Sequence, residues 1–309
     1  MASDIAVIRN GSLEAAIATG FGNVAFSFHA AGREILWTPA PPDQWLSSQA
    51  DRVHIPFGGI PLLAPWANRI DGDAYYANGA RFHLNPDLAD LRRDGNGLPI
   101  HGLLAFCQGW KVVRQDASSV TSRLEFWRKP RWMAQFPFAH NLEITHRLTG
   151  SELEIETAVE NLSAERMPLC IGFHPYFQLT DSPRDTWRLY IPARRSVVLS
   201  DKLVPTGQTR PMDLAQPFPL AGNALDSVFS GLTGSEFVAE GPTQRISVRF
   251  GPKFPVAIVY APAGQSFFCF EPMSALTNAF NLDHAGVDAG LQHIPPGETW
   301  RESFWITPA

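Results

Sequence analysis

Residues 142–159, LEITHRLTGSELEIETAV, decide the fold of this chain. Apolar and polar side chains alternate with a period of two through 142–148 and again through 153–159, which is typical of strands with one buried face. The Thr-Gly-Ser segment at 149–151 separates the two runs and supplies a turn. The stretch therefore predicts an antiparallel β-hairpin.

Further strands are predicted towards the C-terminus. Residues 246–250 and 256–260 are strand-like runs on either side of the Gly-Pro-Lys turn at 251–253, and they predict a second hairpin. Residues 303–306, SFWI, predict a closing strand, and helical periodicity is nearly absent.

The length and punctuation of the chain favour one large domain. Its 309 residues, 45% of them hydrophobic, can fill a large core. The 24 glycines and 26 prolines are spread along the chain instead of gathered in one linker, and no fixed-period repeat is evident. We expect an all-β fold, a large antiparallel β-sandwich in a single domain over residues 1–309.

Pro-, Gly-, Asp- and Asn-rich stretches predict long loops at 38–49, 85–97 and 206–222, and loops over a sandwich face often carry or cover sites.

Charge and cysteine usage restrict the partners. Charged residues make up only 18% of the chain and the net charge is -5, so no electrostatic footprint for nucleic acid or an anionic membrane is present. The N-terminal residues lack the pattern of a secretory signal, and no apolar run reaches the length of a membrane span. Cys107, Cys170 and Cys269 are odd in number and lack CxxC spacing, which predicts neither disulfides nor a zinc knuckle. We expect a soluble cytoplasmic protein, a monomer or homodimer, that binds a small polar molecule.

Several ionisable residues lie in apolar, aromatic surroundings. The segments 65–70, PWANRI, and 172–177, GFHPYF, each contain one such residue, Arg69 or His174. Burial beside aromatic rings desolvates a charge and shifts its pKa, so each residue needs a partner or a ligand. A salt bridge or a hydrogen-bonded core histidine would satisfy the same requirement. The full candidate set is Arg69, His101, His174, Asp226 and Glu271.

These residues belong to five short segments whose order along the chain is informative. The segments read NRI at 68–70, IHGL at 100–103, HPYF at 174–177, DSVF at 226–229 and FEP at 270–272. Together they resemble the aldose 1-epimerases, or galactose mutarotases, and the related hexose-6-phosphate mutarotases, over nearly the whole chain.

The resemblance implies a β-supersandwich with the sugar across an open concave face and no cofactor or metal. It implies that His174 is the general acid at the ring oxygen and Glu271 the general base at the anomeric hydroxyl. Arg69, His101 and Asp226 would position sugar hydroxyls. Three neighbours of the motif residues are further candidates for contact with the sugar: Trp66, Asn68 and Tyr176.

The residue types suit proton transfer at neutral pH. Histidine can both give and take a proton there, and a carboxylate is a competent base. We expect a nearby Arg69 to keep Glu271 ionised, and a nearby carboxylate to raise the pKa of His174.

One departure from the family pattern leaves the sugar open. Glu271 is followed by Pro-Met-Ser, whereas galactose mutarotases usually have Thr-Gln at this point. A phosphorylated sugar would need several converging cations. Three basic groups could supply such cations: residues 92–93, residues 128–129 with Arg131, and residues 194–195. We expect them to be solvated loop charges instead. Trp110, Trp127 and Trp132 are expected in the core.

Three other classes of protein remain open. A non-catalytic sugar-binding or sugar-sensing sandwich would share the fold but does not need a His and Glu pair. A glycoside hydrolase could use Asp226 and Glu271, which leaves His174 without a role. A metalloenzyme could use His101, His174, Asp226 and Glu271, although no local metal-binding spacing supports it.

Overall fold

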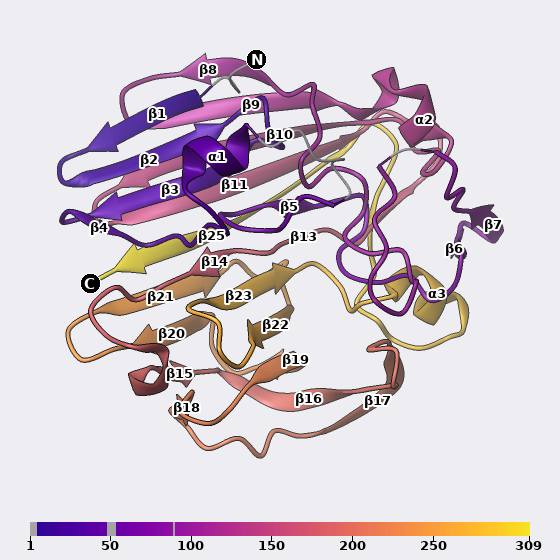
Figure 1. Cartoon of the computed structure of the whole chain (residues 1–309). Coiled ribbons are helices and arrows are strands. Elements are labelled where there is room, and N and C mark those ends of the chain that lie inside the picture. The colour runs from indigo at the N-terminus through magenta and orange to yellow at the C-terminus, as the bar shows by residue number, and fades with distance from the viewer. Residues whose placement is uncertain (1–4, 48–53, 89) are drawn as a thin grey trace.

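The computed structural model describes residues 5–47, 54–88 and 90–309. Antiparallel strands dominate it, as the alternating sequence patterns predict, and they form two large and several small sheets (Figure 1). Among the described residues, the helical elements are short: α1 Pro42–Leu46, η1 Phe126–Arg128, α2 Pro130–Met133, η2 Arg184–Thr186 and α3 Ala279–His284.

A nine-stranded sheet forms one layer, and the first predicted hairpin lies within it. Its strands follow the order β18-β15-β20-β21-β25-β11-β10-β9-β8. β10 and β11 pair along their full length from His140↔Asn161 to Thr149↔Glu152, so this hairpin is confirmed. The predicted C-terminal strand is also confirmed, as β25, and it pairs with β11 and β21. The bounds are β8 Lys111–Gln115, β9 Ser119–Glu125, β10 His140–Thr149, β11 Glu152–Asn161, β15 Arg188–Tyr190, β18 Phe218–Pro219, β20 Glu236–Glu240, β21 Arg245–Phe250 and β25 Thr299–Pro308.

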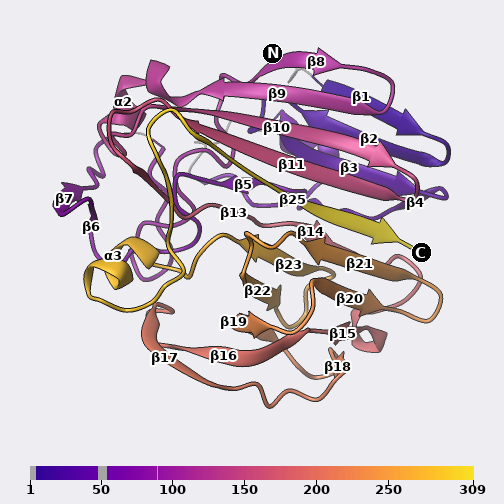
Figure 2. The same cartoon turned by 180° about the vertical axis from the view of Figure 1, so that it is seen from behind.

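Two further sheets lie against this layer (Figures 1 and 2). A four-stranded sheet covers it near β9 and β10, and contains β1 Ile5–Asn10, β2 Leu13–Ala18, β3 Val24–Ala30 and β4 Arg33–Glu34. The second large sheet has the order β17-β16-β19-β22-β23-β13-β5, with β14 also paired to β23. Its bounds are β5 Leu62–Leu63, β13 Gly172–Phe173, β14 Tyr176–Phe177, β16 Ala193–Leu199, β17 Pro205–Pro211, β19 Leu225–Leu232, β22 Val256–Ala261 and β23 Phe268–Met273.

Aromatic side chains join the two large sheets. The ring of Phe173 on β13 lies 5.0 Å from that of Phe304 on β25, and Phe237 on β20 lies 5.5 Å from Phe270 on β23. All four side chains are at most 1% exposed, so they stabilise the sandwich by burying apolar area between its layers. Two small ladders complete the fold: β6 Ala74–Ala77 with β7 Ala80–His83, and β12 Met167–Leu169 with β24 Gln292–Ile294.

The second predicted hairpin is wrong. Both strands exist, but β21 pairs with β20 and β25 in one large sheet, whereas β22 pairs with β19 and β23 in the other. The connection between them closes a local turn, in which the Phe254 N–H donates to the Gly251 carbonyl oxygen at 3.0 Å, and it also contacts β25. Gly251 N–H donates to the Ser303 carbonyl oxygen at 3.0 Å, and Lys253 N–H donates to Glu302 Oε2 at 2.6 Å. The chain therefore crosses from one layer to the other at this turn.

The loop predictions are partly wrong as well. Residues 206–222 include most of β17 and all of β18, because backbone pairing with β16 and β15 orders this polar stretch. Residues 38–49 contain α1, and positions 48 and 49 lie outside the described residues. Residues 85–97, as far as they are described, hold no helix or strand, as predicted.

Within the described part of the chain, no helix is long and apolar enough to span a membrane.

Candidate active site

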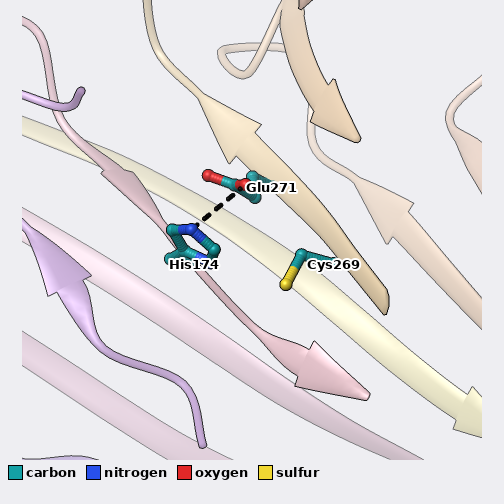
Figure 3. Close-up of side chains that lie close together, drawn as sticks. All are labelled: His174, Cys269 and Glu271. Carbon is teal, nitrogen blue, oxygen red and sulfur yellow. Dashed lines mark ion pairs between the residues drawn. The ribbon is translucent and has the colours of Figure 1, made fainter. Parts of the chain in front are cut away.

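Strand pairing brings His174 opposite Glu271. Two antiparallel pairs bracket these residues: Gly172↔Met273 and Tyr176↔Cys269. Their register places His174 across from Glu271, and its Nε2 lies 3.4 Å from Glu271 Oε1 (Figure 3). His174 is 7% exposed and Glu271 is 1% exposed. Two residues about a hundred positions apart thus form a close buried acid–base pair.

Two left-handed backbone turns direct further polar side chains towards this pair. Asn68 has φ 57° and His101 has φ 62°, a left-handed region that few non-glycine residues occupy but that asparagine and histidine tolerate better than most. The His101 N–H donates to the Asn68 carbonyl oxygen at 2.9 Å, so each turn supports the other. Gly102 follows at φ 64°, and a Cβ there would lie 2.0 Å from the Ala64 carbonyl oxygen. The His101 ring lies 5.5 Å from the His174 ring.

Arg69 is held by a carboxylate that sequence reasoning missed. Arg69 Nε donates to Asp94 Oδ2 at 2.6 Å, and Nη1 donates to Asn68 Oδ1 at 3.0 Å. Burial alone would raise the pKa of Asp94. The hydrogen bond from Arg69 and those from the backbone N–H groups of Leu98 and Asn96 outweigh burial and lower the pKa. The signal in the sequence was an ordinary Asp-Gly-Asn-Gly turn, which predicts a loop but no partner for Arg69.

A cavity of about 220 Å³ joins these side chains. It contains seven of the eight predicted site residues, together with three that were not predicted: Ile100, and Ile258 and Tyr260 of β22. The Tyr176 ring stacks on the His174 ring at 4.6 Å and 6°. The cavity is lined by Asn68, Arg69, Ile100, His101, His174, Tyr176, Asp226, Ile258, Tyr260 and Glu271.

Trp66 is the exception among the predicted residues. Its side chain is 0% exposed and packs in the main hydrophobic core, away from the cavity lining. A single bridge to Cys170 fixes the backbone at Trp66. The left-handed turn at Asn68 then breaks the strand alternation, so neighbours in sequence do not share a face. Trp66 therefore does not line this cavity with the other candidates. Trp127 also departs from expectation, because it is 39% exposed and lies under the Arg128 guanidinium.

Burial has the largest effect on the pKa values of His174 and Glu271. We expected neighbouring charges to have the largest effect. Burial lowers the pKa of His174 to about 3. Burial, and secondarily the charge of Asp226, raise the pKa of Glu271 well above its usual value, although Arg69 opposes them. Burial likewise raises the pKa of Asp226. Burial therefore disfavours the charged form of both groups.

The basic groups considered for a phosphorylated sugar do not line this cavity. Arg93 pairs with Asp73 at 2.7 Å, and Arg128 pairs with Glu125 at 2.7 Å. Arg92 differs from the expected solvated charge, because it is half-buried, lies 4.6 Å from the Phe57 ring centroid and donates to the Ile55 carbonyl oxygen.

Potential metal ligands also differ from the set considered from sequence. Ligand atoms of His174, Cys269 and Glu271 lie within 4.8 Å of one another (Figure 3). His101 and Asp226 do not belong to this group in the described part of the chain. Cys269 is two residues before Glu271 on β23, so the two side chains share one face of the sheet.

The fold of this chain is shared with solved structures of galactose mutarotase-like proteins. The structure superimposes on a galactose mutarotase-like protein from Clostridium acetobutylicum with a TM-score of 0.84 and 20% identity, covering 98% of this chain and 94% of the other. An aldose epimerase homologue from C. elegans gives a TM-score of 0.77 at 19% identity, covering 100% and 99%. The fold is thus of the galactose mutarotase-like class.

Sequence comparison shows the family. The family model for aldose 1-epimerase matches residues 4–307. The chain is also 26% identical to the uncharacterized protein YihR of Escherichia coli over 242 residues, which are 75% of each protein. The chain belongs to the aldose 1-epimerase family.

Proposed function

We propose that this protein is a mutarotase that interconverts the α and β anomers of an unphosphorylated aldose. The observation that carries the proposal is the buried His174–Glu271 pair, with 3.4 Å between Nε2 and Oε1, at the wall of a polar cavity. Ring opening of a hemiacetal needs a proton delivered to the ring oxygen and another removed from the anomeric hydroxyl. A positioned acid and base that hold one proton between them meet both requirements.

The reaction conserves the proton of the pair. The reactive state is the one in which His174 is protonated and Glu271 is a carboxylate. Burial disfavours both charges in the free protein, so the charge of Arg69 and hydrogen bonds from the bound sugar have to stabilise this state. His174 donates this proton to the ring oxygen while Glu271 accepts the proton of the anomeric hydroxyl, so the C1–O5 bond breaks and C1 becomes an aldehyde. Rotation about C1–C2 presents the other carbonyl face. Glu271 then returns its proton to the carbonyl oxygen and His174 takes back the hydroxyl proton as the ring closes. Only protons move, so the reaction needs no cofactor.

The remaining polar side chains of the cavity would hold the sugar during ring opening. Asn68, Arg69 and His101 come from two segments that contact each other, and Asp226 comes from β19 in the second large sheet. Sugar hydroxyls both donate and accept hydrogen bonds, so a cationic, a neutral and an acidic group suit them together. Fixing the ring while C1 rotates would favour reclosure over release of the open chain.

The charges of the cavity support an unphosphorylated substrate. A phosphate dianion calls for several cations in contact with it. Arg69 is the arginine that lines the cavity, and Asp94 already neutralises it at 2.6 Å. Asp226 adds an acidic group to the same lining. The three cysteines are buried free thiols, which fits the cytoplasm as the site of action.

The experiment that tests the proposal is anomeric exchange followed by saturation-transfer NMR or polarimetry. The panel contains glucose, galactose, arabinose and glucose 6-phosphate. We expect the protein to accelerate exchange of at least one unphosphorylated sugar and to leave glucose 6-phosphate at its uncatalysed rate. A folded protein that binds a sugar without accelerating exchange would instead support the alternative, a non-catalytic carbohydrate-binding or sugar-sensing sandwich. Acceleration confined to glucose 6-phosphate would contradict the substrate class.

A further inference from the structure

We propose that His174, Cys269 and Glu271 form a binding site for Zn²⁺, and that zinc bound there blocks the acid–base pair. The site uses one nitrogen, one sulfur and one oxygen ligand from two neighbouring backbone segments. Glu271 and Cys269 come from alternate positions of β23, and His174 faces them from the segment between β13 and β14 (Figure 3).

The geometry requires little adjustment to hold a metal ion. The three ligand atoms lie within 4.8 Å of one another, and His174 Nε2 to Glu271 Oε1 is already 3.4 Å. Ligands of a tetrahedral zinc, with bonds of about 2.0–2.3 Å, are separated by roughly 3.3–3.8 Å. Small changes of side-chain torsion would therefore close the group around an ion.

The ligand types select zinc over the abundant hard cations. Mg²⁺ and Ca²⁺ take oxygen ligands almost entirely, whereas Zn²⁺ accepts the mixed set of imidazole, thiolate and carboxylate. Three protein ligands also leave a fourth position for water or a sugar hydroxyl.

The pair and the thiol have unused capacity for a ligand. Oε2 of Glu271 is buried without a hydrogen-bond partner in the described structure, and a buried polar atom without a partner costs free energy. Cys269 is 0% exposed and packs beside Tyr176 and Phe267, so its sulfur lies in a closed environment directly next to the pair. Zinc binds the thiolate, the neutral imidazole nitrogen and the carboxylate, so any proton that these atoms carry is released to solvent when zinc binds.

Binding of zinc does not depend on the proposed reaction, but its inhibitory effect does. The metal would occupy the same imidazole nitrogen and carboxylate that transfer protons to the sugar. Cys269 itself has no part in the proton transfers, so its removal should spare activity while weakening the metal site. The two roles can therefore be separated by one substitution.

The test measures metal binding directly, with the full-length chain freed of metal by a chelator. Zn²⁺ affinity is determined by competition with a chromophoric chelator for the wild type, Cys269→Ala and the control Cys170→Ala. Cys170 is an equally buried thiol, 2% exposed, whose sulfur contacts the Leu276 carbonyl oxygen instead. We expect one Zn²⁺ per chain for the wild type and Cys170→Ala, and at least tenfold weaker binding for Cys269→Ala. Equal affinities, or no binding to the wild type, would overturn the site.

Cobalt and activity provide two further measurements. Co²⁺ bound to the wild type should show a thiolate-to-metal charge-transfer absorption. The nearly isosteric variant Cys269→Ser should lack this absorption. A wild-type protein without the absorption would also overturn the site. Stoichiometric Zn²⁺ should stop anomeric exchange by the wild type. Inhibition of the Cys269→Ala variant should need at least a tenfold higher Zn²⁺ concentration. If the metal-free wild type shows no exchange, the proposed function fails while the binding data still decide the zinc site.

Discussion

Two buried histidines in different parts of the sandwich have the same shift in pKa and very different surroundings. Burial lowers the pKa of His146 on β10 to about 3, as it does for His174. Each also has a buried Nδ1 without a hydrogen-bond partner. His146, however, lies between the cross-strand neighbours Val120 and Ile155, and no ion pair involves it in the described structure.

The difference lies in what each ring can exchange a proton with. His174 has a carboxylate 3.4 Å from Nε2 and lines a cavity, whereas His146 is enclosed in the nine-stranded sheet. A depressed pKa therefore marks burial and does not by itself mark a catalytic group. Chemistry becomes possible where the buried ring has both a proton partner and room for a substrate. Each prediction below tests that distinction.

The largest effect should come from substitutions in the cavity pair. Glu271→Gln removes the base and His174→Asn removes the acid, and we expect each to slow anomeric exchange by ~10²–10⁴-fold. His146→Leu is the matched control, because it removes an equally buried imidazole far from the cavity. It should exchange sugar at the wild-type rate when folded. A folded His146→Leu as inactive as His174→Asn would refute the distinction.

The second effect concerns stability in acid. Unfolded His146 takes up a proton below its ordinary pKa of 6.5, but the folded residue does so only near 3. The free energy of unfolding should therefore fall as pH falls through this window. His146→Leu should reduce that slope by up to ~1.4 kcal/mol per pH unit. Urea unfolding at pH 7, 6, 5 and 4 measures it, and parallel curves for the two proteins would contradict the assigned cause.

The smallest effect should come from the support of Arg69. Asp94→Asn removes the charge that holds Arg69 at 2.6 Å, so the arginine should position sugar hydroxyls less well. We expect KM to rise by up to ~10-fold with kcat less affected. Asp73→Asn is the control, because it breaks a more exposed pair with Arg93 and should change neither by much. An unchanged KM in Asp94→Asn would show that Arg69 needs no such support.

The sequence predicts strands better than it predicts their partners. Both 142–159 and 246–260 alternate or run apolar as strands do, and all four strands exist. Only the first pair forms a hairpin, because contacts of the second turn with Ser303 and Glu302 are long-range and leave no local pattern.

The same limit applies to the site. Motif resemblance identified residues that the structure brings to one cavity, including His174, Glu271 and Asp226. It gave no sign of Asp94, which reaches Arg69 through a loop contact that spacing does not encode. The period of a strand places Cys269 on the same face as Glu271, but the pairing of β23 with β14, which brings both next to His174, leaves no local pattern. The protonation of the pair was also mispredicted, since the degree of burial depends on packing across two sheets.

The most direct test of the central claim is a double-mutant cycle in anomeric exchange with Glu271→Gln, His174→Asn and the combined variant. If the two residues transfer protons to and from the same sugar in one coupled step, they act as a unit. The double variant should then be about as slow as either single variant. Losses that multiply, so that the double variant is slower by the product of the two single effects, would contradict coupled proton transfer.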